Sequence, residues 1–389
     1  MKITPLQDIQ ELYQEAIYLR RKLHKIPEMA FQEFKTSKFI SNYLKNLGLE
    51  VQENIAGTGV IAYLPGIKGK KTYAFRADMD ALPVTERTRV DFASIHHGKM
   101  HACGHDGHMT ILLLLAKVLC KNKKTLQDNL LFIFQPGEEG PGGALPMIQE
   151  GILDQYHVDS IFGLHIYPEI EQGKIGCCPG PMMAQNGEFD IIIKGKSGHG
   201  ARPQEGIDSI VMASQLIAAL QSIISRNINP IEGGVVTVGT IKGGEARNII
   251  AKEVLLEGTL RAFIEEIYED IKERLNKNAQ GVAMAHESII DVCIRDMYPP
   301  VNNHEKLFKY FKRAIPEENL QIIDPLMISE DFSYYQKEIP GLFFLLGSQN
   351  HGKGYIHGLH SNQFNFDEKI LLIGVEAFYR ILKIMGGIE

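Results

Sequence analysis

The chain has 389 residues, of which 44% are hydrophobic and 23% are charged, and its formal net charge is -6 at pH 7. This length exceeds the size at which a single hydrophobic core usually stops growing, so we expect one large domain plus a smaller one, and the composition excludes general disorder. The negative charge excludes a nucleic-acid surface, since Lys and Arg form only short groups such as 121–124, and no apolar run approaches the roughly 20 residues that a membrane span requires.

The first part of the chain alternates predicted helices and strands. Apolar residues recur three or four apart over 9–23 and 36–47, which is typical of amphipathic helices, and Pro27 and Gly48 mark their ends. Apolar runs then predict four strands, with a helix at 107–120 between the second and the third: 59–64, 72–77, 130–135 and 160–165. This alternation predicts an α/β fold with a mixed sheet and helices on both of its faces.

The pattern changes at about Asn186. A strand, a long helix, two strands, a charged helix and a final strand follow, over 188–194, 208–225, 234–241, 252–261, 265–279 and 288–295. This order is typical of a compact α+β unit with its own core. The α/β pattern resumes with a helix at 306–314, a strand at 342–346 and a helix at 367–385. We therefore predict a larger domain of residues 1–185 and 298–389, interrupted by an inserted domain of residues 186–297.

Four short motifs of the larger domain contain side chains that bind metal ions in proteins. They are Cys103 and His105 in Met-His-Ala-Cys-Gly-His-Asp, Glu138 and Glu139 in Gln-Pro-Gly-Glu-Glu-Gly, His165 in Gly-Leu-His-Ile and His360 in Gly-Leu-His-Ser. Singly, each motif has a structural alternative, such as a histidine cluster in a surface loop, a solvated acidic turn or a buried histidine with satisfied hydrogen bonds. Jointly they favour a metal site, because most of them follow elements of one α/β sheet, where such sheets form their sites.

The number of these ligands exceeds the four of a structural zinc site. Five side chains, Cys103, His105, Glu139, His165 and His360, therefore point to two metal ions that share ligands. Glu138 is surplus to this count and stands beside Glu139. This favours an enzyme over a metal-stabilised scaffold without activity.

The chain resembles the metallo-aminoacylase family, which includes hippurate hydrolases, indole-acetyl-amino-acid hydrolases and N-acetyldiaminopimelate deacetylases. The four motifs above, together with Arg-Ala-Asp-Met-Asp-Ala-Leu-Pro (76–83), Ser-Gly-His-Gly-Ala (197–201) and Ser-Glu-Asp-Phe (329–332), keep the family's order over nearly the whole chain. The resemblance implies a dinuclear-metal hydrolase domain interrupted by a smaller lid domain, which is often used for dimerisation. It also implies hydrolysis of N-acyl, in particular N-acetyl, amino acids to a free amino acid and a carboxylic acid.

The resemblance assigns a role to each ligand-type residue. Cys103 would bridge the two ions, with His105, Glu139, His165 and His360 completing their coordination, and Glu138 would be the general base that moves the proton from water to the leaving nitrogen. In the wider superfamily a metal-binding histidine stands at the position of Asp78, so we expect Asp80 to orient a ligand histidine instead of binding metal itself. Gly137 and Gln204 depart from the Ala and His of many relatives, which bears on substrate preference more than on chemistry.

The inserted domain supplies three further candidates. The resemblance places Asn248 near the substrate carboxylate, and Arg247 beside it is a second candidate for substrate binding, with an exposed turn residue as the equal alternative. His199 lies between two glycines that let the backbone turn tightly, and its imidazole can donate a hydrogen bond to an oxyanion. The alternative for His199 is a turn histidine that closes a local hydrogen bond. We expect it to act on the substrate, either in its own subunit or across the interface of a homodimer.

The predicted cofactors are two divalent ions, Zn²⁺ or Mn²⁺ first and Co²⁺ or Ni²⁺ as alternatives, because Cys, His and carboxylate ligands together accept all four. The predicted partner is a small N-acyl amino acid, and a metallo-exopeptidase acting on dipeptides remains the alternative function. Glu28, Phe31, Gln32 and the segment 96–101 resemble N-acetyldiaminopimelate deacetylases, whereas 180–183 resembles broader aminoacylases. Five cysteines without framework spacing suit reduced thiols, so we predict a cytoplasmic location.

Overall fold

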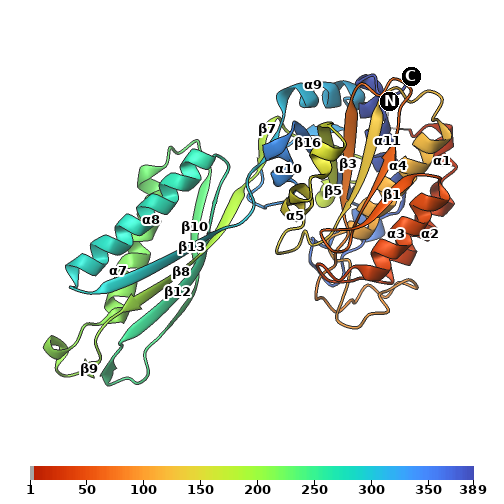
Figure 1. Ribbon diagram of the computed structural model, residues 1–389. Coiled ribbons are helices and arrows are strands. Elements are labelled where there is room, and N and C mark those ends of the chain that lie inside the picture. Colours follow the sequence, from red (N-terminus) through yellow and green to blue (C-terminus); the bar gives the residue numbers. More distant parts are fainter. Residues whose placement is uncertain (1–3) are drawn as a thin grey trace. The chain divides into compact units, whose positions relative to one another are not determined.

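The computed structural model describes residues 4–389, which divide into two compact units, each with its own hydrophobic core (Figure 1). The larger unit comprises Met1–Gly180, Asn302–Asp324 and Asp331–Glu389, and the smaller one Pro181–Val301 and Pro325–Glu330. The sequence did not predict that the segment Pro325–Glu330 belongs to the smaller unit. Backbone hydrogen bonds from Ala184 to the carbonyl oxygens of Leu326 and Ile328 explain this placement.

The larger unit is built on an eight-stranded mixed sheet. Its strands lie in the order β1 (Glu50–Ile55), β2 (Gly59–Leu64), β4 (Asn129–Gln135), β3 (Thr72–Asp78), β5 (Val158–Glu171), β16 (Gly341–Gln349), β6 (Ile175–Cys177) and β15 (Leu320–Ile322). The central strands β4, β3, β5 and β16 are parallel, and every residue of β3 is buried, as expected for a strand covered on both faces. The predicted α/β fold with a mixed sheet is confirmed.

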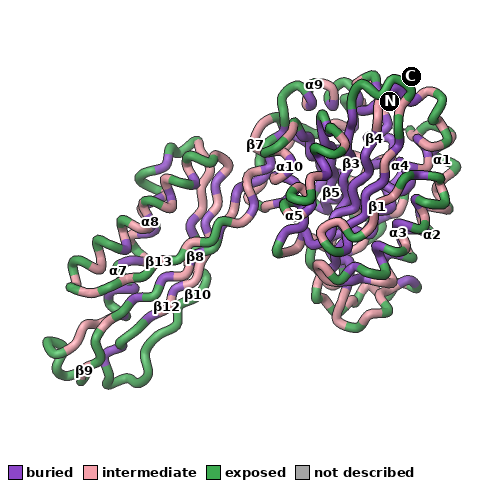
Figure 2. Tube along the Cα trace, viewed as in Figure 1, coloured by how far each residue is buried: buried purple, intermediate pink, exposed green. Residues whose placement is uncertain are grey.

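Helices cover both faces of this sheet. One face packs against α2 (Tyr13–His24), α3 (Phe34–Asn46), α4 (His105–Lys121), α9 (Glu305–Ala314) and α11 (Lys369–Ile384). Alternate residues of β16, such as Phe344, join this core, whereas Phe343 points to the other face and contacts Phe332 at the start of α10 (Ser333–Glu338). The short helix α5 (Ala144–Gln149) packs against α10. Figure 2 shows the strands of the larger unit as its most continuously buried part.

Two elements near the N-terminus differ from the prediction. The helix predicted over 9–23 is two helices, α1 (Gln7–Gln10) and α2, because the N–H of Leu12 bonds to the nearer carbonyl of Ile9 and breaks the regular ladder. Strand β1 was not predicted, because its sequence is mostly polar. It lies at the edge of the sheet, where one side pairs with β2 and polar residues face solvent.

The smaller unit is a four-stranded antiparallel sheet with two helices on one face. The strand order is β10 (Gly234–Gly243), β12 (Glu253–Ala262), β8 (Gln185–Lys194) and β13 (Ile289–Asp296). Alternate residues Phe189, Ile191 and Ile193 of β8 pack against α7 (Ser209–Ser222) and α8 (Glu265–Ala285). A separate two-stranded ladder joins β9 (Gly198–His199) to β11 (Ile249–Ile250).

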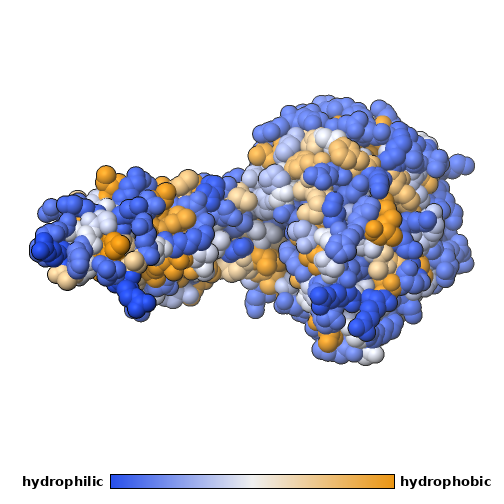
Figure 3. Space-filling view, turned by 90° about the horizontal axis from the view of Figure 1, so that it is seen from below, coloured by the Kyte–Doolittle hydropathy of each residue, from blue (hydrophilic) through white to orange (hydrophobic). Residues whose placement is uncertain are grey.

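One stretch of the described residues, Ser209–Asn227, is long and apolar enough to cross a membrane by length and composition alone. Its residues Met212, Leu216 and Leu220 are fully buried in the core of the smaller unit. A helix in the core of a globular unit passes the same test, so this stretch is weak evidence of a membrane span. On the face that Figure 3 presents, apolar residues are scattered among hydrophilic ones.

Candidate metal centre

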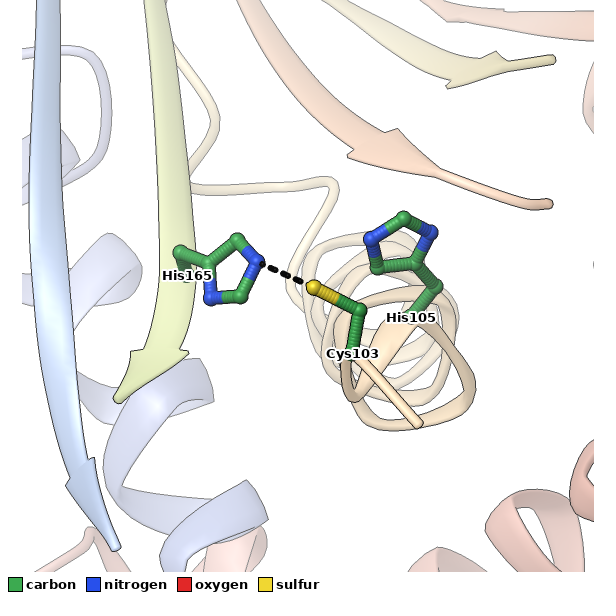
Figure 4. Close-up of side chains that lie close together, drawn as sticks. All are labelled: Cys103, His105 and His165. Carbon is green, nitrogen blue, oxygen red and sulfur yellow. Dashed lines mark hydrogen bonds between the residues drawn. The ribbon is translucent and has the colours of Figure 1, made fainter. Parts of the chain in front are cut away.

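A left-handed glycine brings Cys103 and His105 to the same place. Gly104 between them has φ +90° and forms the N-terminal cap of α4, of which His105 is the first residue. A residue with a side chain rarely adopts this φ, and glycine adopts it without cost. The turn explains how two side chains only two positions apart both lie near His165 of β5, toward which Cys103 points (Figure 4).

Cys103 lies between two histidines. Its Sγ is 3.3 Å from Nε2 of His165 on β5 and 3.4 Å from Nε2 of His360, in the loop before α11. Nδ1 of His165 donates to the carbonyl of Ile166 at 2.7 Å, so its Nε2 is left as the acceptor that a metal ion requires. The backbone N–H of His360 donates to the carbonyl of Ala102 at 2.9 Å, which ties the two loops together.

The two glutamates follow β4 and face the same histidines. Oε1 of Glu139 is 3.3 Å from Nε2 of His360 and 3.9 Å from Nε2 of His105, and Oε2 of Glu138 is 4.0 Å from the same atom of His105. The carboxyl end of β4 lies next to that of β3 because these strands are parallel. This position explains why Glu138 and Glu139 meet residues from α4 and from the C-terminal loop.

The potential ligand atoms form overlapping groups. Within each group they lie within 4.8 Å of one another, and the groups are Cys103, His105 and His165; Cys103, Glu139 and His360; and His105, Glu138 and Glu139. Cys103 belongs to both of the first two groups. Cys103 is therefore a residue that two ions could share, the role that the family resemblance implies for it.

Asp80 supports this cluster from the end of β3. Its Oδ1 and Oδ2 accept the backbone N–H groups of Glu138 and Glu139 at 3.0 and 2.9 Å, and Oδ1 lies 3.4 Å from Nδ1 of His105. The carboxylate thus contacts both the glutamate loop and a histidine that faces the cluster. Such a contact fixes the ring orientation of a metal-binding histidine.

Two residues behind the cluster, His108 and Arg76, were not predicted from the sequence to support the site. Nδ1 of His108 lies 2.7 Å from the carboxylate of Asp78, and its Nε2 accepts the N–H of Ile166 at 2.9 Å. The buried guanidinium of Arg76 donates to Asp78 at 2.9 Å and to Asp331 at 2.7 Å. The signal was present, since His105 and His108 are one helical turn apart and Arg76, Asp78 and Asp80 alternate along one strand.

Carboxylates dominate the electrostatics of the cluster. Burial opposes a positive charge on His105, but the nearby carboxylates of Asp78 and Asp80 outweigh it and raise the pKa of His105 to about 10. Burial, followed by the charges of Glu139 and Glu138, raises the pKa of the Cys103 thiol well above its usual range. Burial lowers the pKa of His165 to about 3 and keeps that imidazole neutral. The pocket therefore favours cations, and a divalent ion would stabilise the thiolate.

Unsatisfied buried atoms test whether these residues fit metal ions. Nε2 of His105 and Oε1 of Glu139 lie 3.9 Å apart, and both are buried without a hydrogen bond of good geometry. Buried polar atoms of native proteins nearly always have a partner, so atoms that converge in this way favour an ion between them. Thiol, imidazole and carboxylate are together a suitable donor set for Zn²⁺, Mn²⁺, Co²⁺ or Ni²⁺.

The candidates of the smaller unit lie at its two-stranded ladder. His199 pairs with Ile249 in this ladder, and the carbonyl of Asn248 accepts the N–H of Gly200 at 2.9 Å. Nδ1 of His199 accepts the N–H of Ala201 at 3.1 Å, which leaves Nε2 pointing away from this local contact. His199, Arg247 and Asn248 are all exposed. The structure therefore brings His199 and Asn248 together and places Arg247 next to them.

The chain is similar to known metal-dependent hydrolases over nearly its whole length. The model of peptidase family M20/M25/M40 matches residues 74–384. N-acetyldiaminopimelate deacetylases of Bacillus cytotoxicus and Priestia megaterium are 40% and 39% identical to it, over 95% and 96% of this chain and 98% and 99% of theirs. A solved Bacillus subtilis structure, described as a dinuclear metal-binding peptidase from the M20 family, is 32% identical and has a TM-score of 0.85 over 97% of this chain and 99% of its own.

Proposed function

Because this chain belongs to peptidase family M20/M25/M40, we propose that it removes the acetyl group from N-acetyldiaminopimelate and releases acetate and free diaminopimelate. The chain is a metal-dependent amide hydrolase. Its similarity to two deacetylases, at about 40% identity over at least 95% of its length, supports the substrate. The observation that best supports hydrolysis is the position of Glu138. Its carboxylate lies beside a cluster that already has enough metal ligands without it.

Two metal ions are the cofactors, and we propose Cys103 as their shared ligand, with His105, Glu139, His165 and His360 completing the site. When bound, the ions would polarise the amide carbonyl and lower the pKa of water from about 15.7 towards about 7. Asp80 orients His105 and fixes the backbone of Glu138 and Glu139 through the contacts described above. Zn²⁺ or Mn²⁺ is the proposed native metal, with Co²⁺ or Ni²⁺ as alternatives.

Glu138 is the proposed general base. Its carboxylate accepts a proton from the water that attacks the acetyl carbonyl, and the same oxygen then delivers that proton to the leaving nitrogen. The backbone N–H of Glu138 donates to Asp80, so the backbone from which this carboxylate extends is fixed before substrate binds. A base held at a fixed position requires little reorganisation during the reaction.

The smaller unit contributes the proposed substrate-binding groups. We propose that Arg247 and Asn248 bind the carboxylate of the substrate and that His199 donates to the developing oxyanion. A homodimer through this unit is also proposed, supported by the exposed apolar residues Ile210 and Val211 on α7. The five cysteines are free thiols, which supports the cytoplasm as the proposed compartment.

The test is a metal-by-substrate assay. The purified protein is stripped of metal, reloaded separately with Zn²⁺, Mn²⁺, Co²⁺ or Ni²⁺, and offered N-acetyldiaminopimelate, other N-acetyl amino acids and dipeptides. We expect acetate release to be fastest from N-acetyldiaminopimelate. Faster cleavage of dipeptides under every metal would instead identify an exopeptidase and refute the proposed substrate.

A further inference from the structure

Buried carboxylates hold three consecutive backbone amides of the loop that carries the proposed base. Asp80 accepts the N–H groups of Glu138 and Glu139, and Glu33 accepts the N–H of Gly137 with its Oε1 at 3.0 Å. Glu33 and Asp80 come from different elements, the start of α3 and the end of β3. The loop is therefore fixed from two directions, and only one of these carboxylates belongs to the site described so far.

The side chain of Glu33 is directed at this loop and away from its own helix. Glu33 is the N-terminal cap residue of α3, but its side chain makes no capping hydrogen bond. Glu28 caps the helix instead, because its Oε2 accepts the N–H groups of Lys35 and Thr36 at 2.9 Å. The second oxygen of Glu33 accepts a hydrogen bond from the hydroxyl of Thr58, and the residue is 0% exposed.

The conformation of Gly137 explains why this loop needs support. Gly137 has φ +65°, and a Cβ on it would lie 2.7 Å from the ring of Phe31, two residues before Glu33. The short segment from Glu28 to Glu33 thus contacts the loop twice, through the ring of Phe31 and the carboxylate of Glu33. Its backbone also meets the end of β3, since the N–H of Ala81 donates to the carbonyl of Glu28 at 2.8 Å.

We propose that Glu33 is a positioning residue for hydrolysis: by accepting the N–H of Gly137, it orients the loop so that the carboxylate of Glu138 faces the attacking water. This inference rests on the proposed function, in which Glu138 is the general base. An error of about 1 Å in the placement of a reacting group can cost about a hundredfold in rate. The carboxylate of Glu33 accepts hydrogen bonds from Gly137 and Thr58, neither of which is a proposed metal ligand, so it acts through the loop.

The burial of Glu33 supports a role beyond folding. Burial, opposed by the hydrogen bond from Thr58, raises the pKa of Glu33 to about 7. A carboxyl at such a site is costly to bury and would be replaced easily by an apolar residue if it only filled space. An apolar residue at this position could not accept the hydrogen bond from the N–H of Gly137.

Variants of Glu33 and Glu28 test the proposal in the metal-loaded enzyme. Glu33→Ala removes the acceptor, Glu33→Gln keeps it, and Glu33→Asp shortens the side chain so that it cannot reach both Gly137 and Thr58. Glu28→Ala is the matched control, since it removes a buried carboxylate from the same segment without touching the loop. At saturating metal we measure kcat, KM and metal content, and the hydrogen exchange of the segment 136–140.

We expect Glu33→Ala to lower kcat by about tenfold to a hundredfold with two ions bound and KM little changed. Exchange at 136–140 should become faster, Glu33→Asp should be intermediate, and Glu33→Gln should restore most of the activity. Glu28→Ala should lower the thermal stability but leave kcat and this exchange unchanged. If Glu33→Ala does not fold, kcat and loop exchange are compared between Glu33→Asp and the wild type instead.

The proposal is overturned if Glu33→Ala, or Glu33→Asp in its place, keeps the kcat and loop exchange of the wild type. It is also overturned if Glu33→Gln is as impaired as Glu33→Ala. Failure of the proposed function is distinguishable, because the wild type would then release no acetate from N-acetyldiaminopimelate. The exchange measurement would still report whether Glu33 holds the loop.

Discussion

The two units hold most of their candidate residues in opposite ways, and His360 of the larger unit, which is also exposed, is the exception. In the larger unit, Cys103, His105 and His165 are buried, and each has neighbours that fix its position before any ligand arrives. In the smaller unit, His199, Arg247 and Asn248 are exposed, and the hydrogen bonds described above for His199 and Asn248 are local and involve the backbone. The buried groups of the larger unit are therefore preorganised before substrate binds, whereas the groups proposed to contact the substrate from the smaller unit are still solvated.

This contrast predicts different costs of substitution. Removing a preorganised group should abolish metal binding or turnover, because nothing nearby can take its place. Removing an exposed group should cost only the interaction that it makes with the substrate.

Cys103→Ala should abolish turnover and lower the metal content, because it removes the ligand shared by two groups of the cluster. Elemental analysis and an acetate-release assay measure the two effects. Cys120→Ala is the control, since Cys120 is half-buried near the end of α4, away from the cluster, and should change neither quantity. Full occupancy of both metal positions in Cys103→Ala would show that the thiol does not bridge the ions.

Glu138→Gln should keep both metals and lower kcat by roughly three orders of magnitude or more, because the amide cannot accept the proton from water. Metal content and kcat are measured on the same preparation. Glu150→Gln, an exposed glutamate after α5, serves as a control for the loss of one negative charge. A Glu138→Gln enzyme with normal kcat would refute the mechanism.

His199→Ala should lower kcat by roughly a hundredfold, the scale of losing one oxyanion donor, with the metal content unchanged. This variant tests the exposed side of the comparison. His286, which is partly exposed in the smaller unit, gives the matched control His286→Ala, which should keep normal kcat. Normal turnover in His199→Ala would return His199 to the alternative of a turn histidine with a local hydrogen bond.

Mixing two inactive proteins tests whether His199 acts across subunits. His199→Ala and Glu138→Gln subunits are combined under conditions in which exchange between subunits is demonstrated. If the site is shared, some heterodimers contain one intact site and activity partly returns. No recovery after proven exchange would show that each site is complete within one subunit.

Glu86→Gln should lower the free energy of unfolding by roughly 2 kcal/mol at pH 6, because the carboxylate lies 3.2 Å from buried His24. Burial alone would raise the pKa of Glu86, but the hydrogen bond and charge of His24 lower it to about 2. A carboxyl with a lowered pKa stabilises the folded state above its ordinary pKa and loses this effect as the pH falls. The deficit should therefore shrink between pH 6 and pH 3 in urea unfolding.

The smaller unit supplies the control for this prediction. Glu245 forms an exposed ion pair with Lys252 at 3.1 Å, and exposed pairs contribute about 0–1 kcal/mol. Glu245→Gln should therefore change the stability little at either pH. An equal loss in both variants would contradict the idea that preorganisation is concentrated in the larger unit.

Periodicity and turn residues predicted most of the fold. The strand predicted at 59–64 matches β2, and the helix at 107–120 lies within α4, because long apolar runs and helical spacing are strong local signals. Strand β1 and the break between α1 and α2 were missed. In both places the local pattern is weak, and pairing with a neighbour or a single altered hydrogen bond decides the structure.

The sequence by itself determined which residue types are available for catalysis and the order of the motifs that contain them. Only the tertiary structure decided which of them meet. His360 lies 257 residues from Cys103 along the chain but 3.4 Å from it in space, and Glu33 meets Gly137 across 104 residues. The physical reason is that parallel pairing of β4, β3, β5 and β16 aligns their carboxyl ends, so the order of strands in the sheet, which no local pattern encodes, sets the distances between the loops.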